Sequence, residues 1–265
     1  MAQNKNLTGK VAIVTGSSRG IGAAIALKLA SHGADVVINY HSSAEAAESV
    51  AAKARDEHGV RSLSVKADVS SQDGLARLFE TAKKELGKVD IVMSNSGIEH
   101  FGSLEEVKGE EIDKIFAVNV KAQYFVAQQA HKYLEKGGRL ILMSSVSAVM
   151  GTPRHAIYSA SKAAVTGMVK CLARDFGPRN ITVNAVAPGG VKSDMYAVAA
   201  KEYIPGGDQM TIEEIDARIS GSSPLGRVGL PEDVAGVVAL LSSPEAQWLT
   251  GQTIHVSGGA HMATS

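Results

Sequence analysis

The sequence has a single cysteine, no net charge and no long apolar run, and each of these absences excludes a class of protein. Cys171 cannot form an intrachain disulfide, and a zinc site built from cysteines alone is excluded. Lys and Arg number 27 against 27 Asp and Glu, so nothing indicates a nucleic-acid or anionic-membrane partner. The eight histidines show no spacing typical of a metal site, so we expect no bound metal.

The start of the sequence does not resemble a secretory signal. Residues 1–6 lack the apolar segment of a secretory signal, and no apolar stretch reaches the length needed to cross a bilayer. We therefore expect a soluble, cytoplasmic protein. A chain of 265 residues with 45% apolar residues is long enough for one large core, and no linker interrupts it.

A glycine-rich turn follows the first apolar run, Val11–Thr15, and precedes a helical pattern. Gly16 permits a tight turn, Gly20 lets backbone N–H groups approach a pyrophosphate, and Gly22 allows the helix to pack closely on the strand. A glycine pattern alone is weak evidence, but its position between a strand and a helix predicts a dinucleotide site. The residues of this turn that we expect to contact the cofactor are Gly16, Arg19, Gly20, Ile21 and Gly22.

The second strand, Asp35–Tyr40, ends without the acidic residue that would bind the ribose hydroxyls of NAD. Arg19 instead offers a fixed cation, and Tyr40, His41, Ser42 and Ser43 follow with further donors, which favours a 2′-phosphate. The sequence therefore predicts NADP(H) as the cofactor. The alternative is that Arg19 is a solvated loop charge.

Tyr158 and Lys162 are four residues apart in a helical pattern, and Ser145 lies thirteen residues upstream at the end of a buried strand. Residues at this spacing share one face of a helix, and a nearby cation lowers the pKa of a phenol, which would make Tyr158 a general acid. A Tyr–Lys pair also occurs on many helices without any function. The catalytic interpretation of Tyr158 and Lys162 therefore depends on the other motifs in the chain.

Apolar strand patterns alternate with helical ones along the whole chain, which predicts an α/β fold of parallel βαβ units. Right-handed crossovers then give a single-domain, doubly wound parallel sheet of the Rossmann type flanked by helices. The strands are expected near residues 11–15, 35–39, 61–66, 89–94, 138–144, 181–186 and 252–256.

Taken together, these motifs resemble the short-chain dehydrogenase/reductase family over essentially the whole chain, from Lys10 to about Gly259. The resemblance implies that Asn119, Ser145, Tyr158 and Lys162 are the catalytic residues, with Asn119 anchoring a water near Lys162. It also implies that Asp68 and Val69 flank the adenine and that Asn95 and Gly97 shape the wall beside the nicotinamide ribose. The remaining cofactor contacts that it implies are Pro188, Gly189, Val191 and Ser193.

Several stretches resemble one group of that family, the fungal reductases of hydroxynaphthalenes and hydroxyanthraquinones in polyketide metabolism. This resemblance implies NADPH-dependent reduction of a ring carbonyl, in the keto tautomer, and a small substrate lid at about residues 193–222. In that lid Tyr203 would stack on a flat aromatic substrate, with Met195, Tyr196 and Ile204 supplying apolar contacts. Two departures are one residue fewer between Ser145 and Tyr158 and a tail that continues over residues 261–265.

Other readings of the chain stay open. The same catalytic residues would serve a 3-oxoacyl-thioester reductase, for which Lys192, Lys201 and Arg218 could bind an acyl carrier protein. A non-catalytic NADP(H)-binding scaffold is a more remote alternative, since it would not need Tyr158 and Lys162. Apolar residues on two faces of the helices near 112–134 and 157–176 favour a homotetramer, as the family resemblance implies, with a dimer as the alternative.

Overall fold

A computed structural model describes residues 5–262, which form a parallel sheet in the order β3-β2-β1-β4-β5-β6-β7. Every pairing in this sheet is parallel, and the order reverses between β1 and β4. This is the predicted doubly wound architecture, and the reversal creates the crevice where such sheets bind ligands. The strands are β1 Val11–Val14, β2 Asp35–Tyr40, β3 Ser62–Lys66, β4 Val89–Ser94, β5 Leu134–Met143, β6 Thr182–Pro188 and β7 Thr253–Val256.

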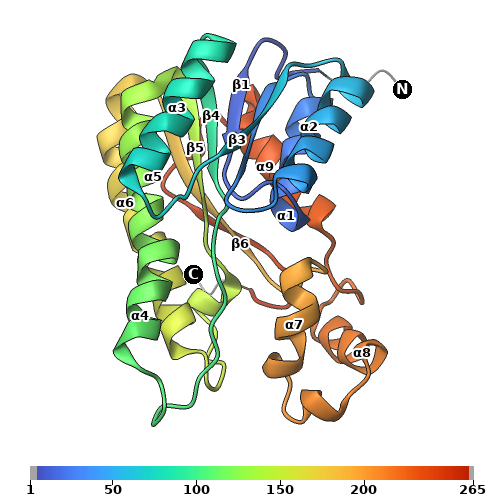
Figure 1. Cartoon of the computed structure of the whole chain (residues 1–265). Helices are drawn as coiled ribbons and strands as arrows, with labels where there is room; N and C mark the ends of the chain where they lie inside the picture. Colours follow the sequence, from blue (N-terminus) through green and yellow to red (C-terminus); the bar gives the residue numbers. More distant parts are fainter. Residues whose placement is uncertain (1–4, 263–265) are drawn as a thin grey trace.

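Helices cover both faces of the sheet (Figure 1). Helices α3, α5 and α6 pack on one face, and α1, α2 and α9 pack on the other, each group around its own buried apolar cluster. The helices are α1 Gly20–Ser31, α2 Ala44–His58, α3 Gln72–Leu86, α4 Gly109–Phe116, α5 Ala122–Tyr133, α6 Ala156–Phe176, α7 Asp194–Tyr203, α8 Ile212–Ser222 and α9 Pro231–Ser242. Five short turns complete them, namely η1 Ala117–Lys121, η2 Val146–Ala148, η3 Gly177–Arg179, η4 Gly207–Gln209 and η5 Pro244–Ala246.

Helix α3 shows how local sequence determines these elements. Ser71 caps its first turn by accepting a hydrogen bond from the backbone N–H of Gly74 at 3.2 Å, and Gly87 ends it with a φ of 90°. Its buried residues recur at helical spacing, so one apolar stripe faces the sheet. These residues are Leu75, Leu78, Phe79, Ala82 and Leu86.

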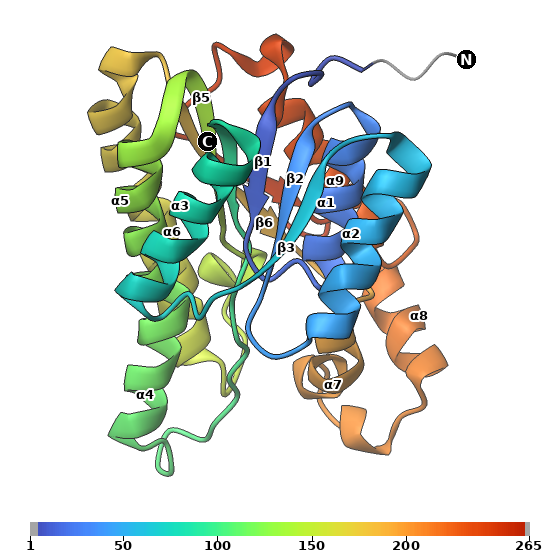
Figure 2. The same ribbon diagram turned by 45° about the horizontal axis from the view of Figure 1, so that its top comes forward.

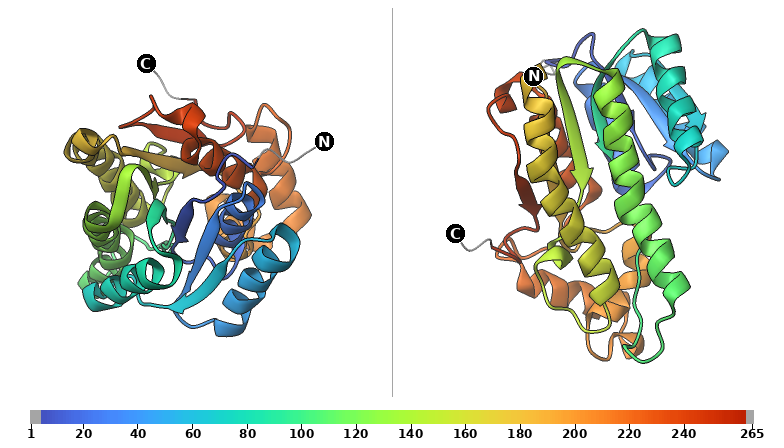
Figure 3. Two further views of the ribbon diagram at one scale, coloured as in Figure 1. Left: turned by 90° about the horizontal axis from the view of Figure 1, so that it is seen from above. Right: turned by 90° about the vertical axis from the view of Figure 1, so that its left-hand side faces the viewer.

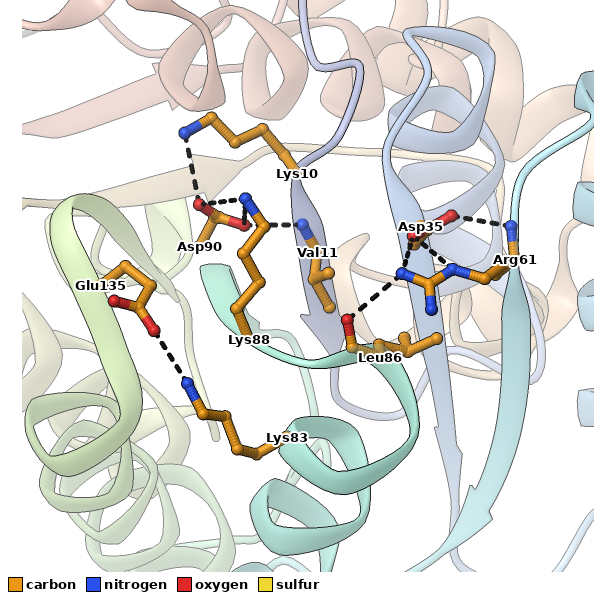
Figure 4. A network of polar contacts seen from close by, with 9 residues as sticks. All are labelled: Lys10, Val11, Asp35, Arg61, Lys83, Leu86, Lys88, Asp90 and Glu135. Carbon is orange, nitrogen blue, oxygen red and sulfur yellow. Dashed lines mark hydrogen bonds and ion pairs between the residues drawn. The ribbon is translucent and has the colours of Figure 1, made fainter.

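A network of ion pairs holds the end of the sheet where the strands begin (Figure 4). Asp90 is almost fully buried and accepts hydrogen bonds from the backbone N–H of Val11 at 2.9 Å and from Lys10 at 3.2 Å. Arg61 binds both carboxylate oxygens of Asp35, with Nη2 2.7 Å from Oδ2, and also donates to the carbonyl of Leu86. Since this network joins β1, β2, β4 and the segments around them at the end opposite the glycine turn, we assign it to stability.

The strands end beside α7 and α8, which pack on each other below the sheet (Figure 2). Tyr196, Ala200, Ile215 and Val228 form a small buried cluster between these helices that is separate from the two main clusters. The segment 193–222 is thus a helical pair with its own core. Within residues 5–262, none of the helices is both long and apolar enough to cross a membrane.

Candidate active site

Ser145, Tyr158 and Lys162 meet where β5 ends and α6 begins. The side chain of Ser145 caps the η2 turn and hydrogen-bonds the Tyr158 hydroxyl, and Tyr158 is only 7% exposed. Lys162 is buried one helical turn further on, with Nζ 5.5 Å from the centre of the Tyr158 ring. Its ammonium donates to the carbonyl oxygen of Met143, the last residue of β5, at 3.2 Å.

Burial rather than the neighbouring cation dominates the pKa of Tyr158. We expected Lys162 to lower this pKa, but removal from water raises it well above its usual value, and the charge of Glu99 raises it further. Burial also lowers the pKa of Lys162 to about 8. Tyr158 is therefore a neutral phenol at neutral pH, which is the protonation state that a proton donor needs.

Asn119 lies in a π-helical turn, η1, that joins α4 to α5. There the backbone N–H of Ala122 bonds to the carbonyl of Ala117, five residues back, and such turns often mark functional sites. Asn119 is fully buried, with Nδ2 donating to the carbonyl of Ile98 at 2.9 Å and to Oγ of Ser161 at 3.1 Å. A carbon atom at Cβ of Gly97 would lie 3.2 Å from Lys162 Nζ, so a side chain there would crowd the site.

Gln123 is a supporting residue that sequence reasoning missed. Its side chain exchanges two hydrogen bonds with the backbone of Met143, at 2.9 and 3.2 Å, and also donates to the carbonyl of Asn119. It thereby ties the π turn to the strand end that holds Lys162. Glutamine is common on helices, so no sequence signal identified Gln123. Its side chain is directed towards β5 because the π turn η1 shifts the helical register just before it.

The glycine turn is held by two asparagines. Asn95 Nδ2 donates to the carbonyls of Thr15 and Gly16, both at 3.0 Å, and Asn39 Oδ1 accepts from the backbone N–H of Gly16 at 3.1 Å. That Asn95 shapes the wall beside the nicotinamide ribose stays a prediction; its side-chain amide is used to hold the turn. Gly22 is tightly enclosed, because a Cβ there would lie 2.4 Å from the carbonyl oxygen of Gly16.

Arg19 and the residues after β2 lie on the exposed side of the glycine turn. Arg19 precedes α1 and lies 3.5 Å from Asp194, the first residue of α7. His41 lies 4.0 Å from Asp68, whose pKa is lowered by hydrogen bonds from Ser70. Tyr40 ends β2, and Ser42 and Ser43 lead into α2.

The other residues expected at the cofactor fall at or near the strand ends. Val69 is buried in the cluster under α3, α5 and α6, and Ile21 packs against the cluster on the opposite face. Pro188 ends β6, and Gly189 is so close to Ser257 that a Cβ would lie 2.8 Å from its Cβ. Val191 pairs with Gly229 in an isolated bridge, and Ser193 caps α7 by accepting from the N–H of Tyr196.

Three aromatic rings, those of Phe101, His155 and Tyr203, pack on one another beside the ring of Tyr158. Phe101, in the loop after β4, stacks on His155 at 4.3 Å and meets the edge of Tyr203 at 5.1 Å. His155 in turn lies 4.6 Å from the Tyr158 ring, and Tyr203 comes from the end of α7. Phe101 was not identified from the sequence, because nothing in its local pattern separates it from an ordinary loop residue.

The remaining substrate candidates lie around α7 in different settings. Tyr196 is buried in the cluster between α7 and α8, and its hydroxyl donates to Asp216 at 2.6 Å. Ile204 packs against the same cluster, whereas Met195 is 42% exposed. Of the four predicted residues, Tyr203 is therefore the one that joins the aromatic rings around Tyr158.

Glu99 is a third residue of the site, after Gln123 and Phe101, that the sequence did not reveal. Its Oε2 accepts from the Tyr203 hydroxyl at 3.2 Å, and its Oε1 lies 3.3 Å from Nε2 of His155. Burial raises the pKa of Glu99 to about 7 and lowers that of His155 to about 4. A carboxyl group thus lies among the aromatic rings, beside the residues expected to perform the reaction.

Comparison with known proteins agrees with this geometry. A family model described as enoyl-(acyl carrier protein) reductase matches residues 16–261. Versicolorin reductase 1 of Dothistroma septosporum is 49% identical over 258 residues, which cover 97% of this chain and 98% of that protein. Trihydroxynaphthalene reductase of Colletotrichum orbiculare is 48% identical over 258 residues, covering 97% and 91%.

A solved structure extends the likeness to three dimensions. The angucycline C-6 ketoreductase LanV, crystallised with bound NADP, superposes with a TM-score of 0.86 at 38% sequence identity. The match covers 96% of each chain. The sheet, both helical layers and the helices at the strand ends are therefore shared with a protein that holds NADP.

Proposed function

Because the chain belongs to the short-chain dehydrogenase/reductase family, we propose that it is an NADPH-dependent reductase of polyhydroxylated aromatic polyketides. The acceptor would be a ring carbonyl, in the keto tautomer, of a compound such as a hydroxynaphthalene or a hydroxyanthraquinone. The observation that carries this proposal is the group of rings, Phe101, His155 and Tyr203, that pack on one another next to the ring of Tyr158. Flat aromatic substrates stack on such side chains.

The residues at the glycine turn fit a dinucleotide with a 2′-phosphate. The space beside Gly22 is filled by backbone and by Asn95, so the turn is kept narrow enough for N–H groups to approach a pyrophosphate. The end of β2 carries no carboxylate. The amide of Asn39 there accepts from the N–H of Gly16 and donates to the carbonyl of Ala67. Arg19 is free to turn towards a phosphate, because its contact with Asp194 is between two exposed side chains.

NADPH, when bound, would supply the hydride, and side chains of the protein would bind the carbonyl oxygen and protonate it. Ser145 and Tyr158, which already share a hydrogen bond, hold the carbonyl oxygen, and Tyr158 gives it a proton. Lys162, with a pKa of about 8, stands behind Tyr158 and supports the phenolate that forms. The hydrogen bond from Asn119 to Ser161 holds the π turn against helix α6, which carries Tyr158 and Lys162.

Reduction of a 3-oxoacyl thioester gains no support from the surface near the cleft. Of the three basic residues that could bind a carrier protein, Lys192 forms an ion pair with Asp216. Lys201 and Arg218 are exposed, but Glu202 lies next to the first of them in the sequence and Glu214 one helical turn before the second. The local charge is therefore mixed rather than basic.

The outer surfaces of α4, α5 and α6 support assembly into a homotetramer. Helices α4 and α5 follow one another end to end with α6 beside them at the edge of the molecule, and no other element of the described chain covers them (Figure 3). Tyr124 is 47% exposed there, and Cys171 is also exposed. Trp248, a few residues before the final strand, is 98% exposed and offers a second apolar contact for two-fold assembly.

The test is NADPH consumption by the purified protein with a hydroxynaphthalene, a hydroxyanthraquinone under reducing conditions, an acetoacetyl thioester and 2-tetralone. We expect the polyphenols to exceed the thioester in kcat/KM by at least a hundredfold. Tyr158→Phe should lose about a thousandfold in kcat while still binding NADPH, because it removes the proton donor and leaves the ring. Preference for the thioester, or full activity of Tyr158→Phe, would overturn the proposal.

A further inference from the structure

Glu99 and His155 form a buried acid–base pair that hydride transfer does not use. The Glu99 side chain is 16% exposed and that of His155 is fully buried. Oε1 of Glu99 has no hydrogen-bond partner among residues 5–262, although Nε2 of His155 lies 3.3 Å away. The other carboxylate oxygen, Oε2, is on the side of Tyr203 and accepts from its hydroxyl.

The hydrogen bonds of His155 fix which of its nitrogens carries a proton. Nδ1 lies 2.9 Å from the carbonyl oxygen of His100, which can only accept, so Nδ1 carries the hydrogen. In the neutral ring Nε2 is then an acceptor, and both Oε1 of Glu99 and the Tyr203 hydroxyl lie 3.3 Å from it. The Tyr203 hydroxyl has one hydrogen, and when it donates that hydrogen to Oε2 of Glu99, Nε2 and Oε1 are left facing each other. Two buried acceptors that face each other are stable only when a proton lies between them. The pair therefore holds one proton.

The surroundings place this proton on Glu99 near neutral pH. Burial raises the pKa of Glu99 to about 7, and burial lowers that of His155 to about 4. A carboxyl group that titrates near the working pH is suited to taking and giving protons. The other titratable groups that face the pair are Lys162 and Tyr158 on α6, Tyr203 on α7, and His100, which lies 3.5 Å from Glu111 of α4.

The proposed substrate creates a need for such a group. A polyhydroxylated arene is an enol, and hydride can add only after a proton has moved from a ring hydroxyl to the neighbouring ring carbon. The His155 ring lies 4.6 Å from that of Tyr158, so the pair lies beside the place where the carbonyl would be held. On the basis of the proposed function, we infer that Glu99, with His155 behind it, interconverts the enol and keto forms of the substrate in the reductase cleft.

The step balances without any oxidant or reductant. Oε2 of Glu99 takes the proton of the ring hydroxyl, breaking an O–H bond, while the resting proton on Oε1 passes to Nε2 of His155. Oε2 then delivers its proton to the neighbouring ring carbon, forming a C–H bond and leaving a carbonyl. His155 returns its proton to Oε1 across the 3.3 Å contact. The Tyr203 hydroxyl, 3.2 Å from Oε2, holds this oxygen in position by a hydrogen bond.

The experiment measures exchange of ring hydrogens for deuterium in the absence of NADPH. A resorcinol-type dihydroxynaphthalene in deuterium oxide is followed by proton NMR with the wild-type chain, Glu99→Gln and the matched control Glu105→Gln. Glu105 is exposed in the same loop. We expect the wild type and Glu105→Gln to accelerate exchange at least tenfold over buffer, and Glu99→Gln to fall to the buffer rate.

A second arm separates this inference from the proposed function. With NADPH present, Glu99→Gln should lose at least ten times more kcat on the dihydroxynaphthalene than on 2-tetralone, which is already a ketone. Failure of the wild type to reduce either compound would contradict the proposed function, whatever the exchange shows. Exchange that is equally fast in Glu99→Gln, or equal losses on both substrates, would overturn the inference about Glu99.

Discussion

Arg19 is the single side chain on which the preference for NADPH is expected to depend. It extends from the glycine turn, and β2 ends without a carboxylate. Arg19→Ala should lower kcat/KM for NADPH about tenfold or more and leave that for NADH within about twofold, since one charge-assisted contact to a phosphate contributes about 1.5–3 kcal/mol. Steady-state kinetics with both cofactors measure this, and Arg218→Ala, on exposed α8, is the control. Equal losses with both cofactors would show that Arg19 holds the turn rather than the phosphate.

Glu99 should also be visible in the pH dependence of stability. In the folded protein the Glu99–His155 pair holds one proton, on Glu99, with pKa values of about 7 and 4. Between about pH 5 and 6.5 the unfolded chain also holds one, on the histidine. The pair therefore adds little pH dependence there, because the raised pKa of Glu99 favours folding at low pH and the lowered pKa of His155 favours it at high pH.

Glu99→Gln removes the contribution of Glu99 to the pH dependence of stability and leaves that of His155. The folded variant would hold no proton at His155 while its unfolded chain gains one below pH 6.5, so stability should fall by about 1 kcal/mol per pH unit from 6.5 towards 4. Denaturant unfolding of the wild type, Glu99→Gln and Glu105→Gln at pH 5 and 7 measures the difference. Parallel pH profiles for all three would show that the two groups do not share a proton.

Among individual residues, those that the sequence predicts lie at a fixed spacing within one motif. Tyr158 and Lys162 are one helical turn apart, and Ser145 directly follows the end of β5, so their meeting follows from secondary structure alone. Glu99 and Phe101 lie in an irregular loop, and their partners His155 and Tyr203 come from two helices distant in the chain. Such contacts depend on the tertiary path of a loop, which no periodicity encodes.

Among the elements, the turn between β1 and α1 leaves no room for a side chain at Gly22. Gly22→Ala would place a Cβ 2.4 Å from the carbonyl oxygen of Gly16 and 2.6 Å from Asn95 Nδ2. We expect it to weaken NADPH binding at least tenfold and to lower the melting temperature by several degrees. Titration of NADPH fluorescence and thermal unfolding measure these effects. Gly109→Ala, where a Cβ meets nothing within 4 Å, is the control, and similar behaviour of the two variants would contradict this account.

The order of strands and helices followed from the sequence, whereas two local features did not. Strand β5 begins at Leu134 rather than near residue 138, because Leu134 already pairs with Val89 of β4. The next four residues form an irregularity in the pairing, with a φ of 79° at Gly137, and regular pairing resumes at Arg139. The π turn at 117–121 was also unexpected, since apolar spacing cannot distinguish an inserted residue from a regular helix. Both features depend on packing partners.

For the whole molecule, the proposed tetramer rests on exposed apolar residues at two faces. Trp248→Lys should split the tetramer into dimers that still carry complete active sites, because Trp248 is 98% exposed and is not one of the residues around Tyr158. Light scattering after size exclusion measures the mass. Leu104→Lys, at an apolar residue that is 89% exposed in the loop after β4, is the charge-matched control. Unchanged mass for Trp248→Lys would place the interface elsewhere.

The crossing order of the sheet has a consequence during synthesis of the chain. The glycine turn lies within the first 22 residues, yet four of its hydrogen bonds are made with Asn95 and Ser96, beyond β4. On the ribosome, β1, β2 and β3 emerge and can pair first, but the turn stays unbraced until residue 96 has left the exit tunnel. Nascent chains arrested before that residue should therefore be unable to retain the dinucleotide, and the cofactor can act as a folding ligand only late in translation.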